Sequence, residues 1–328
     1  MHRALPLVPR ARRPRGAAKA VLGLGLGAAA LSMLAPAAAA VAGPIPDTGL
    51  AAQIAPALVS TTTTPLAAGV SGVLRDGDSE PLVDTPVQAM AQGDGVIYVG
   101  GKFANVVRPD GTTGAQSYLA AFDDVTGAWI PSFAPTLDGT VWDLAVAPNG
   151  NLIVAGQFTN VSGAAHTAGL AMLDPRTGAV ISSWRADAIV TGTTARPLVR
   201  AIDIEGPWLY VGGNFTRLTG SNGIAVPEGR LGRVAVATGA VDKAFRPDIT
   251  GVVYDIDATP DRVYAVGKFT RVNGVAQVAV AQLDPDTGLQ LPGMQPPVLT
   301  DASKSRQLYF AVLELGDHVW LGGSQHTT

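Results

Sequence analysis

The sequence predicts an all-β protein, a β-propeller built from four-stranded antiparallel blades of about 55 residues, and three observations lead to this fold class. The 328 residues include 39 Gly and 24 Pro, a composition rich in turns and poor in long helices. A glycine-containing segment returns every 54–57 residues, and each copy carries four short strand-like runs. A unit of this size cannot bury both faces alone, so copies are expected to pack radially.

Residues 1–40 are expected to be a signal peptide. They hold six basic residues and no acidic one, an apolar run over Ala20–Leu34, and a small-residue cleavage site at Ala38–Ala40. A membrane anchor is the alternative, which Pro36 and the glycines of the run disfavour. We therefore expect a secreted or cell-surface-associated protein that has no membrane span after cleavage. The segment 41–86 shows no sustained strand or helix period and is predicted to be a linker.

The repeats are expected to fill residues 87–328, as four complete copies and a fifth that stops after its second strand. A ring needs whole blades, so the propeller is predicted to be incomplete at its C-terminus and the chain to be an N-terminal fragment of a longer protein. The equivalent glycines, at which the second strand of each copy ends, are Gly101, Gly156, Gly213, Gly267 and Gly323.

Within each copy the four predicted strands follow a common order. The first begins 14 or 15 residues before the glycine, at Val87, Val141, Val199 and Val253. A phenylalanine two residues after the glycine is expected to fill space between blades. The third run is apolar and ends in a Thr-Gly turn, before which Asp123, Asp174 and Asp284 are expected to accept hydrogen bonds from backbone amides. In three copies a large aromatic residue follows the turn: Phe133, Trp184 and Phe245.

Two connections in each copy vary in length, the second-to-third and the fourth-to-first, and a meander places both at one end of the blade. Variable loops on a fixed scaffold are common binding surfaces, although any single charged residue there is more often simply solvated. The candidate binding residues on this predicted loop face are Arg108, Asp110, His166, Arg196, Glu228, Arg230, Lys304 and Arg306.

The predicted innermost strands carry carboxylates that are expected to face an axial channel: Asp143, Asp203, Asp255 and Asp257. Several together could hold a divalent cation. The alternatives are hydration by channel water or hydrogen bonds to neighbouring backbone amides. No calcium-loop motif accompanies them, and no other cofactor is expected.

Composition also restricts the function. The chain has no Cys, which excludes disulfides and cysteine nucleophiles, and none of the common catalytic motifs is present. Beyond residue 40 there are 17 basic against 26 acidic residues, so nucleic acid is not an expected partner. We expect a non-catalytic module that binds an extracellular protein or glycan.

The segments Gly156–Val161, Gly267–Gly274 and Leu283–Gly288 resemble the delta-60 β-propeller repeats of secreted bacterial proteins. That resemblance covers about 87–328 and implies a scaffold that precedes further extracellular modules, without a defined activity. An alternative is a quinoprotein dehydrogenase that binds pyrroloquinoline quinone, because Trp184 follows an Asp-x-x-Thr-Gly motif. The aromatic residue lies further from the turn than in that family and is Phe in two of three copies. A purely structural spacer is the third alternative.

Overall fold

The computed structural model describes residues 68–71, 87–227, 229–294 and 305–327, and every regular element within them is a strand. Each repeat forms one main antiparallel sheet, in which the second strand lies between the first and the third. The first three main sheets are β2 (Val87–Gly93), β3 (Val96–Gly101) and β6 (Leu119–Asp123); β7 (Val141–Val146), β8 (Leu152–Gly156) and β9 (Leu170–Leu173); and β11 (Leu198–Glu205), β12 (Trp208–Asn214) and β15 (Leu231–Ala235).

The fourth and fifth repeats continue this pattern. The fourth main sheet consists of β16 (Ile249–Ala258), β17 (Val263–Val272) and β19 (Val280–Leu283), and the short β18 (Val275–Ala276) pairs with the end of β17. The fifth consists of β20 (Ser305–Leu315) and β21 (His318–Thr327). Two small sheets accompany the first and third repeats: β1 (Gly69–Ser71), β4 (Asn105–Val107) and β5 (Thr113–Ala115); and β10 (Ala186–Ile189), β13 (Arg217–Gly220) and β14 (Ala225–Pro227).

The predicted fourth strand is much shorter than expected. After the Thr-Gly turn the chain makes one isolated bridge to the third strand in each copy, at Phe122–Trp129, Leu173–Val180, Val234–Val241 and Leu283–Gln290. In the first and fourth copies a proline lies two residues after the bridge, Pro131 and Pro292, and proline has no N–H to continue the ladder. The main sheets are therefore three-stranded with a bridged fourth segment, and the fifth is two-stranded.

Every first strand contains a β-bulge at the same place. The register between the first and second strands shifts by one residue at Gln88, Trp142, Arg200, Tyr254 and Phe310. The repeat glycine lies opposite this bulge, where a Cβ on Gly213 would be 2.0 Å from the carbonyl oxygen of Leu198. The glycine recurs because the bulged backbone leaves no room for a side chain.

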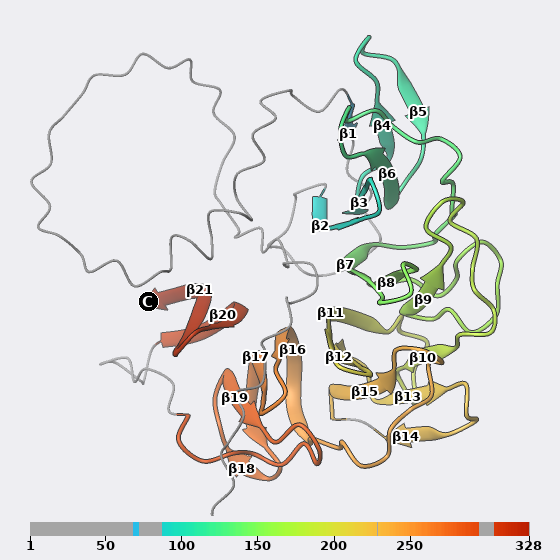
Figure 1. Cartoon of the computed structure of the whole chain (residues 1–328). Coiled ribbons are helices and arrows are strands. Elements are labelled where there is room, and N and C mark those ends of the chain that lie inside the picture. The colour runs from blue at the N-terminus through green and yellow to red at the C-terminus, as the bar shows by residue number, and fades with distance from the viewer. Residues whose placement is uncertain (1–67, 72–86, 228, 295–304, 328) are drawn as a thin grey trace, which may run out of the picture.

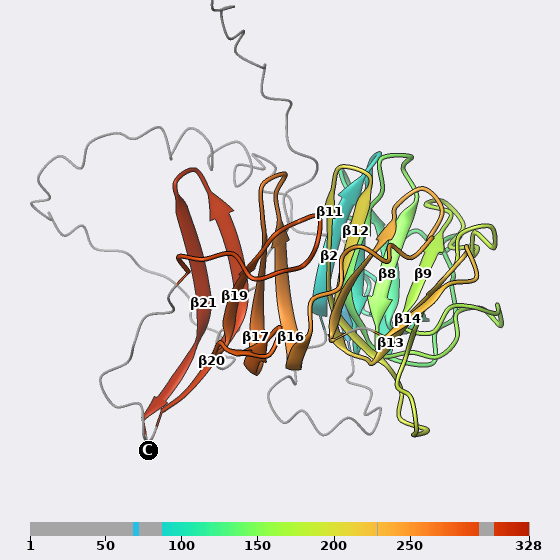
Figure 2. The same cartoon turned by 90° about the horizontal axis from the view of Figure 1, so that it is seen from below.

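The main sheets lie side by side along an arc, with their first strands on the inside (Figure 1). Contacts link β2 to β7, β7 to β11, β11 to β16 and β16 to β20, so each sheet packs on the next in chain order. Seen from the side, the strands run between two loop-bearing ends of the molecule (Figure 2). Within the described residues the arc is open, and no closed ring is seen (Figure 1).

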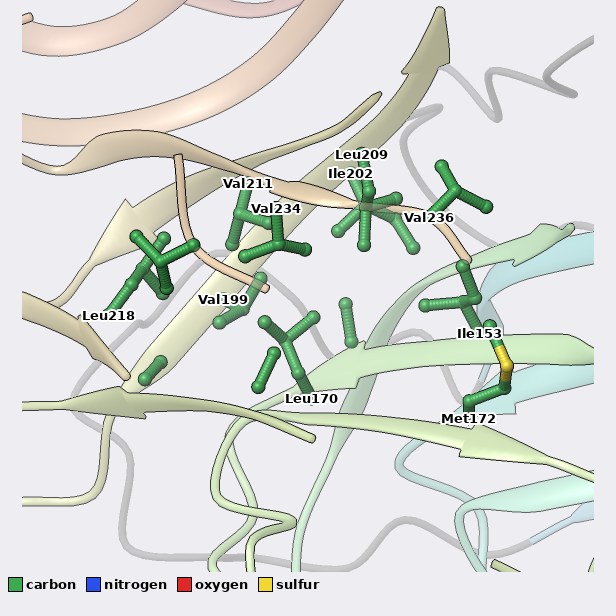
Figure 3. Packing of buried hydrophobic residues seen from close by; sticks show 14 of the residues in the cluster. Ile153, Leu170, Met172, Val199, Ile202, Leu209, Val211, Leu218, Val234 and Val236 are labelled. Carbon is green, nitrogen blue, oxygen red and sulfur yellow. The ribbon is translucent and has the colours of Figure 1, made fainter. Parts of the chain in front are cut away.

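The hydrophobic core lies between neighbouring sheets rather than within one. Between the second and third sheets, Ile153, Leu170 and Met172 meet Val199 and Val211 (Figure 3). The phenylalanine after the repeat glycine is buried in all four copies that have it, at Phe103, Phe158, Phe215 and Phe269. Such side chains contribute about 1.5–3 kcal/mol each when fully buried, so the stack of sheets stabilises itself through these interfaces.

Part of the predicted linker 41–86 is a strand. Gly69–Ser71 forms β1 and pairs with β4, an outer hairpin strand of the first repeat. The rest of that segment, apart from Ala68, and the predicted signal peptide lie outside the described residues. No helix in the described part of the chain is long and apolar enough to cross a membrane.

Candidate binding surface

The two variable connections of each repeat meet and pair with one another. The pairs are β1 with β4, Leu137 with Val161, β10 with β13, and Ile249 with Val272. They were expected to be plain loops at one end of the blade. Instead the second-to-third connection forms a hairpin whose tip folds back toward the Thr-Gly turn, where Asn273 Nδ2 donates to the carbonyl oxygen of Gly288 at 2.9 Å.

Arg108 and Asp110 lie in the β4–β5 hairpin and support its geometry. The Asp110 carboxylate accepts hydrogen bonds from the N–H and the hydroxyl of Thr112, at 2.9 and 2.6 Å, and these bonds lower the pKa of Asp110. The Arg108 guanidinium donates to the carbonyl of Thr113 and lies 4.9 Å from the centre of the Trp129 ring. Both residues therefore have local partners at the outer rim.

His166 joins its own connection to β10. Its Nδ1 lies 2.8 Å from Oδ2 of Asp187, whose other oxygen accepts the N–H of Ala168. The backbone of His166 has a positive φ of 60°, a conformation that few non-glycine residues adopt. The contact joins the second-to-third connection of the second repeat to β10, which lies in the segment that leads into the third repeat.

Arg196 and Arg230 are anchored at the loop-side end of the third sheet, Arg196 before its first strand β11 and Arg230 before its third strand β15. Arg196 donates to the backbone carbonyl of Asp138 and lies 3.8 Å from its carboxylate. Burial acts to raise the pKa of Asp138, but hydrogen bonds from Thr159 and Asn160 and the charge of Arg196 outweigh it, so the pKa lies below its ordinary value. Arg230 donates to the carbonyl oxygen of Phe215 at 2.9 Å.

Three of the candidate residues cannot be placed in this surface. Glu228 and Lys304 lie outside the described residues, and Arg306 lies on β20 with a side chain outside them. The structure therefore brings together only part of the predicted set, with Arg196 beside the inner strand β11, Arg230 beside the third strand β15, and Arg108, Asp110 and His166 in the outer hairpins.

The inner-strand carboxylates connect neighbouring sheets. Oδ2 of Asp143 accepts a hydrogen bond from the backbone N–H of Ile202 on β11, and Oδ2 of Asp203 accepts one from the N–H of Ala258 on β16. On the next interface, Asp255 and Asp257 accept hydrogen bonds from the N–H groups of Val312 and Glu314 on β20, and all four bonds are 2.5–2.8 Å long. This is the amide-bound alternative considered above. Among the described residues no group of three or more His, Asp or Glu side chains is placed to hold a metal ion.

A stacked ladder of cations and rings lines the loop-side end of the inner strands, and sequence reasoning missed it. The Lys102 Nζ lies 5.4 Å from the centre of the Trp142 ring, and the Arg200 guanidinium lies 4.2 Å from the same ring. Arg200 also lies 5.0 Å from Tyr254, which stacks on Phe310 at 5.3 Å. Four of the five are the bulged residues of successive first strands. The available signal was their shared position in the repeat, which follows a valine at Val141, Val199 and Val253 and a tyrosine at Tyr309.

The two ends of the molecule differ in charge. We define the mouth as Lys102, Trp142, Arg196, Arg200 and Arg230, whose four cations have the carboxylates of Asp138 and Asp143 beside them. The opposite end, which carries the first-to-second and third-to-fourth turns, has two arginines, Arg176 and Arg262, against nine acidic residues. These are Asp94, Asp123, Asp124, Asp174, Glu205, Asp261, Asp284, Asp286 and Asp317.

The Thr-Gly turns use their aspartates as expected. Oδ1 of Asp174 accepts the N–H and the hydroxyl of Thr177, both at 2.8 Å, and the same bonds recur at Asp123 and Asp284. Trp184 lies between sheets, where its Nε1 donates to the carbonyl oxygen of Val236 at 2.9 Å. The Asp-x-x-Thr-Gly motif and this tryptophan therefore have structural partners in this chain.

Comparison with known proteins supports the fold. A family model described as a domain of unknown function (DUF5122) beta-propeller matches residues 259–286. The match supports a β-propeller. The matched range begins directly after β16, covers β17, β18 and β19, and ends at Asp286, just before the Thr287-Gly288 pair of the fourth repeat. No curated protein matches the chain in sequence.

Several solved structures share a weak likeness. The computationally designed Ika4 protein has a TM-score of 0.35 and 12% identity, over 62% of this chain and 92% of its own. BamB from Moraxella catarrhalis has a TM-score of 0.38 and 13% identity, over 80% of this chain and 91% of its own. The extracellular domain of a putative hybrid two-component system from B. thetaiotaomicron has a TM-score of 0.40 and 15% identity, over 72% of this chain and 25% of its own. At these values the likenesses say nothing about what the chain binds.

Proposed function

We propose that the chain is an exported, non-catalytic β-propeller module of the delta-60 repeat type that binds an extracellular ligand through its mouth. The leader-like residues 1–40 support export. The observation that carries the binding role is the ladder Lys102–Trp142–Arg200–Tyr254–Phe310, which holds cations in fixed positions at one end of an otherwise acidic molecule.

The arrangement suits binding better than catalysis. Rigid sheets hold the bulged residues, and rigid elements position a recognition site more exactly than loops do. The one described histidine of a complete repeat, His166, is held by the Asp187 carboxylate in an outer hairpin. A dehydrogenase function would require a bound quinone, whose absorbance in the purified protein would contradict this proposal.

Capture experiments test the proposal. The full chain, immobilised, is incubated with cell-wall glycans and secreted proteins, beside a double variant of two mouth residues, Arg196→Ser and Arg230→Ser, and a control, Arg176→Ser. Arg176 is 84% exposed at the opposite end, so its variant removes charge away from the mouth. We expect the double variant to lose capture and the control to keep it. Equal capture by all three, or none by any, would favour the spacer alternative.

A further inference from the structure

We infer that the ligand of the mouth is an acidic polysaccharide, bound through its oxyanions by Arg196, Arg200 and Arg230. This inference rests on the proposed binding function and goes beyond it by naming the ligand class. Guanidinium groups present two parallel N–H donors that match carboxylate and other oxyanions, which makes arginine the usual choice for such recognition.

The three arginines are held in place before any ligand arrives. Arg200 is stacked between the Trp142 and Tyr254 rings, with its guanidinium 4.2 and 5.0 Å from their centres. Arg196 reaches back to Asp138 of the preceding repeat, four residues before Trp142. Because their side chains are already ordered, these arginines lose little conformational entropy on binding.

Arg230 belongs to the same mouth by its backbone. Its carbonyl accepts the N–H of Gly213 at 3.0 Å, and a Cβ on Gly213 would lie 3.0 Å from the N atom of Arg200. Arg200, Gly213 and Arg230 therefore lie in one row across the third sheet. All three arginine side chains are partly exposed and remain reachable from solvent.

The mouth lacks what a protein partner would use. Its one ring, Trp142, and the neighbouring Tyr254 both pack against the Arg200 guanidinium and are only 6% and 7% exposed. Protein interfaces depend on exposed apolar and aromatic anchors at their centre, and the exposed large hydrophobic residues described here do not include any mouth residue. A polymer of charged, hydroxylated sugars needs donors rather than apolar pockets. The acidic turns at the other end would orient such a polymer toward the mouth.

Titration of the full chain with polygalacturonate tests the inference, with neutral dextran and dextran sulfate of similar length as comparison arms. We expect polygalacturonate to bind and dextran not to bind, with affinity falling at high salt. The sulfate arm shows whether the site selects carboxylate or accepts any oxyanion. Arg196→Gln should weaken binding at least about tenfold, the loss expected for one charge-assisted hydrogen bond. Arg176→Gln should leave it unchanged.

Arg200→Gln should weaken binding by a similar factor. Since Arg200 also packs between two rings, its variant is checked by circular dichroism, and Arg196→Gln decides if Arg200→Gln does not fold. Equal binding of dextran, unchanged binding by Arg196→Gln, or preferential binding of polyglutamate would overturn the inference. Loss of capture by the mouth variants, together with no binding of either polygalacturonate or dextran sulfate, would leave the binding function standing and reject only the ligand class.

Discussion

At the scale of single residues, the repeat glycine and the turn aspartate explain most of the sequence periodicity. Gly156, Gly213, Gly267 and Gly323 each face a carbonyl oxygen of the bulged first strand, at 2.0–2.2 Å from where a Cβ would lie. The aspartate before the Thr-Gly turn satisfies two N–H groups and a hydroxyl at once. Both residues recur because backbone geometry requires them, whichever ligand the protein binds.

Replacing the glycine is expected to destabilise the fold. Gly213→Ala would force the backbone of Leu198 away from β12, at a cost of at least about 1–3 kcal/mol. Gly69→Ala is the matched control, since no atom lies within 4 Å of its Cβ position. Urea unfolding of both variants measures the difference. Equal free energies of unfolding for the two variants would show that the backbone opposite Gly213 accommodates a Cβ.

The turn aspartates make stability depend on acid pH. Hydrogen bonds from Thr177 lower the pKa of Asp174 below its ordinary value of 3.8. A carboxylate whose folded pKa is lowered stabilises the fold above the unfolded pKa, and this contribution is lost as pH falls through the folded pKa. Asp174→Ala should therefore lower the melting temperature near neutral pH and have little effect at about pH 2. Thermal melts across that range test this, and a constant difference would contradict it.

At the scale of elements, carboxylates from one first strand tie it to the next. Asp143 links β7 to β11, Asp203 links β11 to β16, and Asp255 and Asp257 link β16 to β20. Turns add to these links, because the Tyr98 hydroxyl donates to the carbonyl oxygen of Pro175 in the next repeat at 2.8 Å. Neighbouring sheets are thus joined at the inner strands and at the turns.

Removing one such link should loosen a single interface. Asp203→Ala leaves the amide of Ala258 without its acceptor, at an expected cost of about 1–3 kcal/mol. Asp203→Asn keeps an oxygen that can accept the same hydrogen bond and should cost less. Denaturant unfolding, with hydrogen exchange at Ala258, measures both. Equal losses for the two variants would mean that the charge matters and the hydrogen bond does not.

At the scale of the whole molecule, the described sheets form an open arc whose last member presents a face to solvent. Tyr98, Ile153, Tyr210 and Tyr264 lie three residues before the repeat glycine and are 0–2% exposed beneath the following sheet. Trp320 occupies the same place on β21 and is 53% exposed. The face of the last sheet that carries Trp320 thus corresponds to the faces that are buried in the other four sheets. Among the described residues no further sheet covers it.

Tryptophan fluorescence reports whether this face is open in solution. We expect acrylamide to quench a large component that disappears in Trp320→Phe, because the other tryptophans are partly or fully buried. Trp184→Phe, at 3% exposed, is the control and should leave the quenchable component in place. A shielded Trp320 would mean that another sheet covers β20–β21.

The sequence by itself determined the repeats, their strand order and the role of the turn aspartates. The glycine spacing and the Thr-Gly turns are local signals, since backbone geometry within a few residues requires them. The shortened fourth strand was missed, although Pro131 and Pro292 mark where its ladder stops in two copies. The residue pattern of one strand-like run does not show how many of its residues form a ladder with the neighbouring strand.

Only the tertiary structure decided what the inner strands do. Asp203 and Asp257 can face water, a cation or an amide, and the choice depends on the residue that the next sheet places beside them. Trp142, Tyr254 and Phe310 are aromatic but Arg200 is a cation, so the four residues do not form one repeated residue type in the sequence. They become one ladder because each is the bulged residue of its first strand, in strands more than fifty residues apart, and packing of separate sheets brings those bulges together.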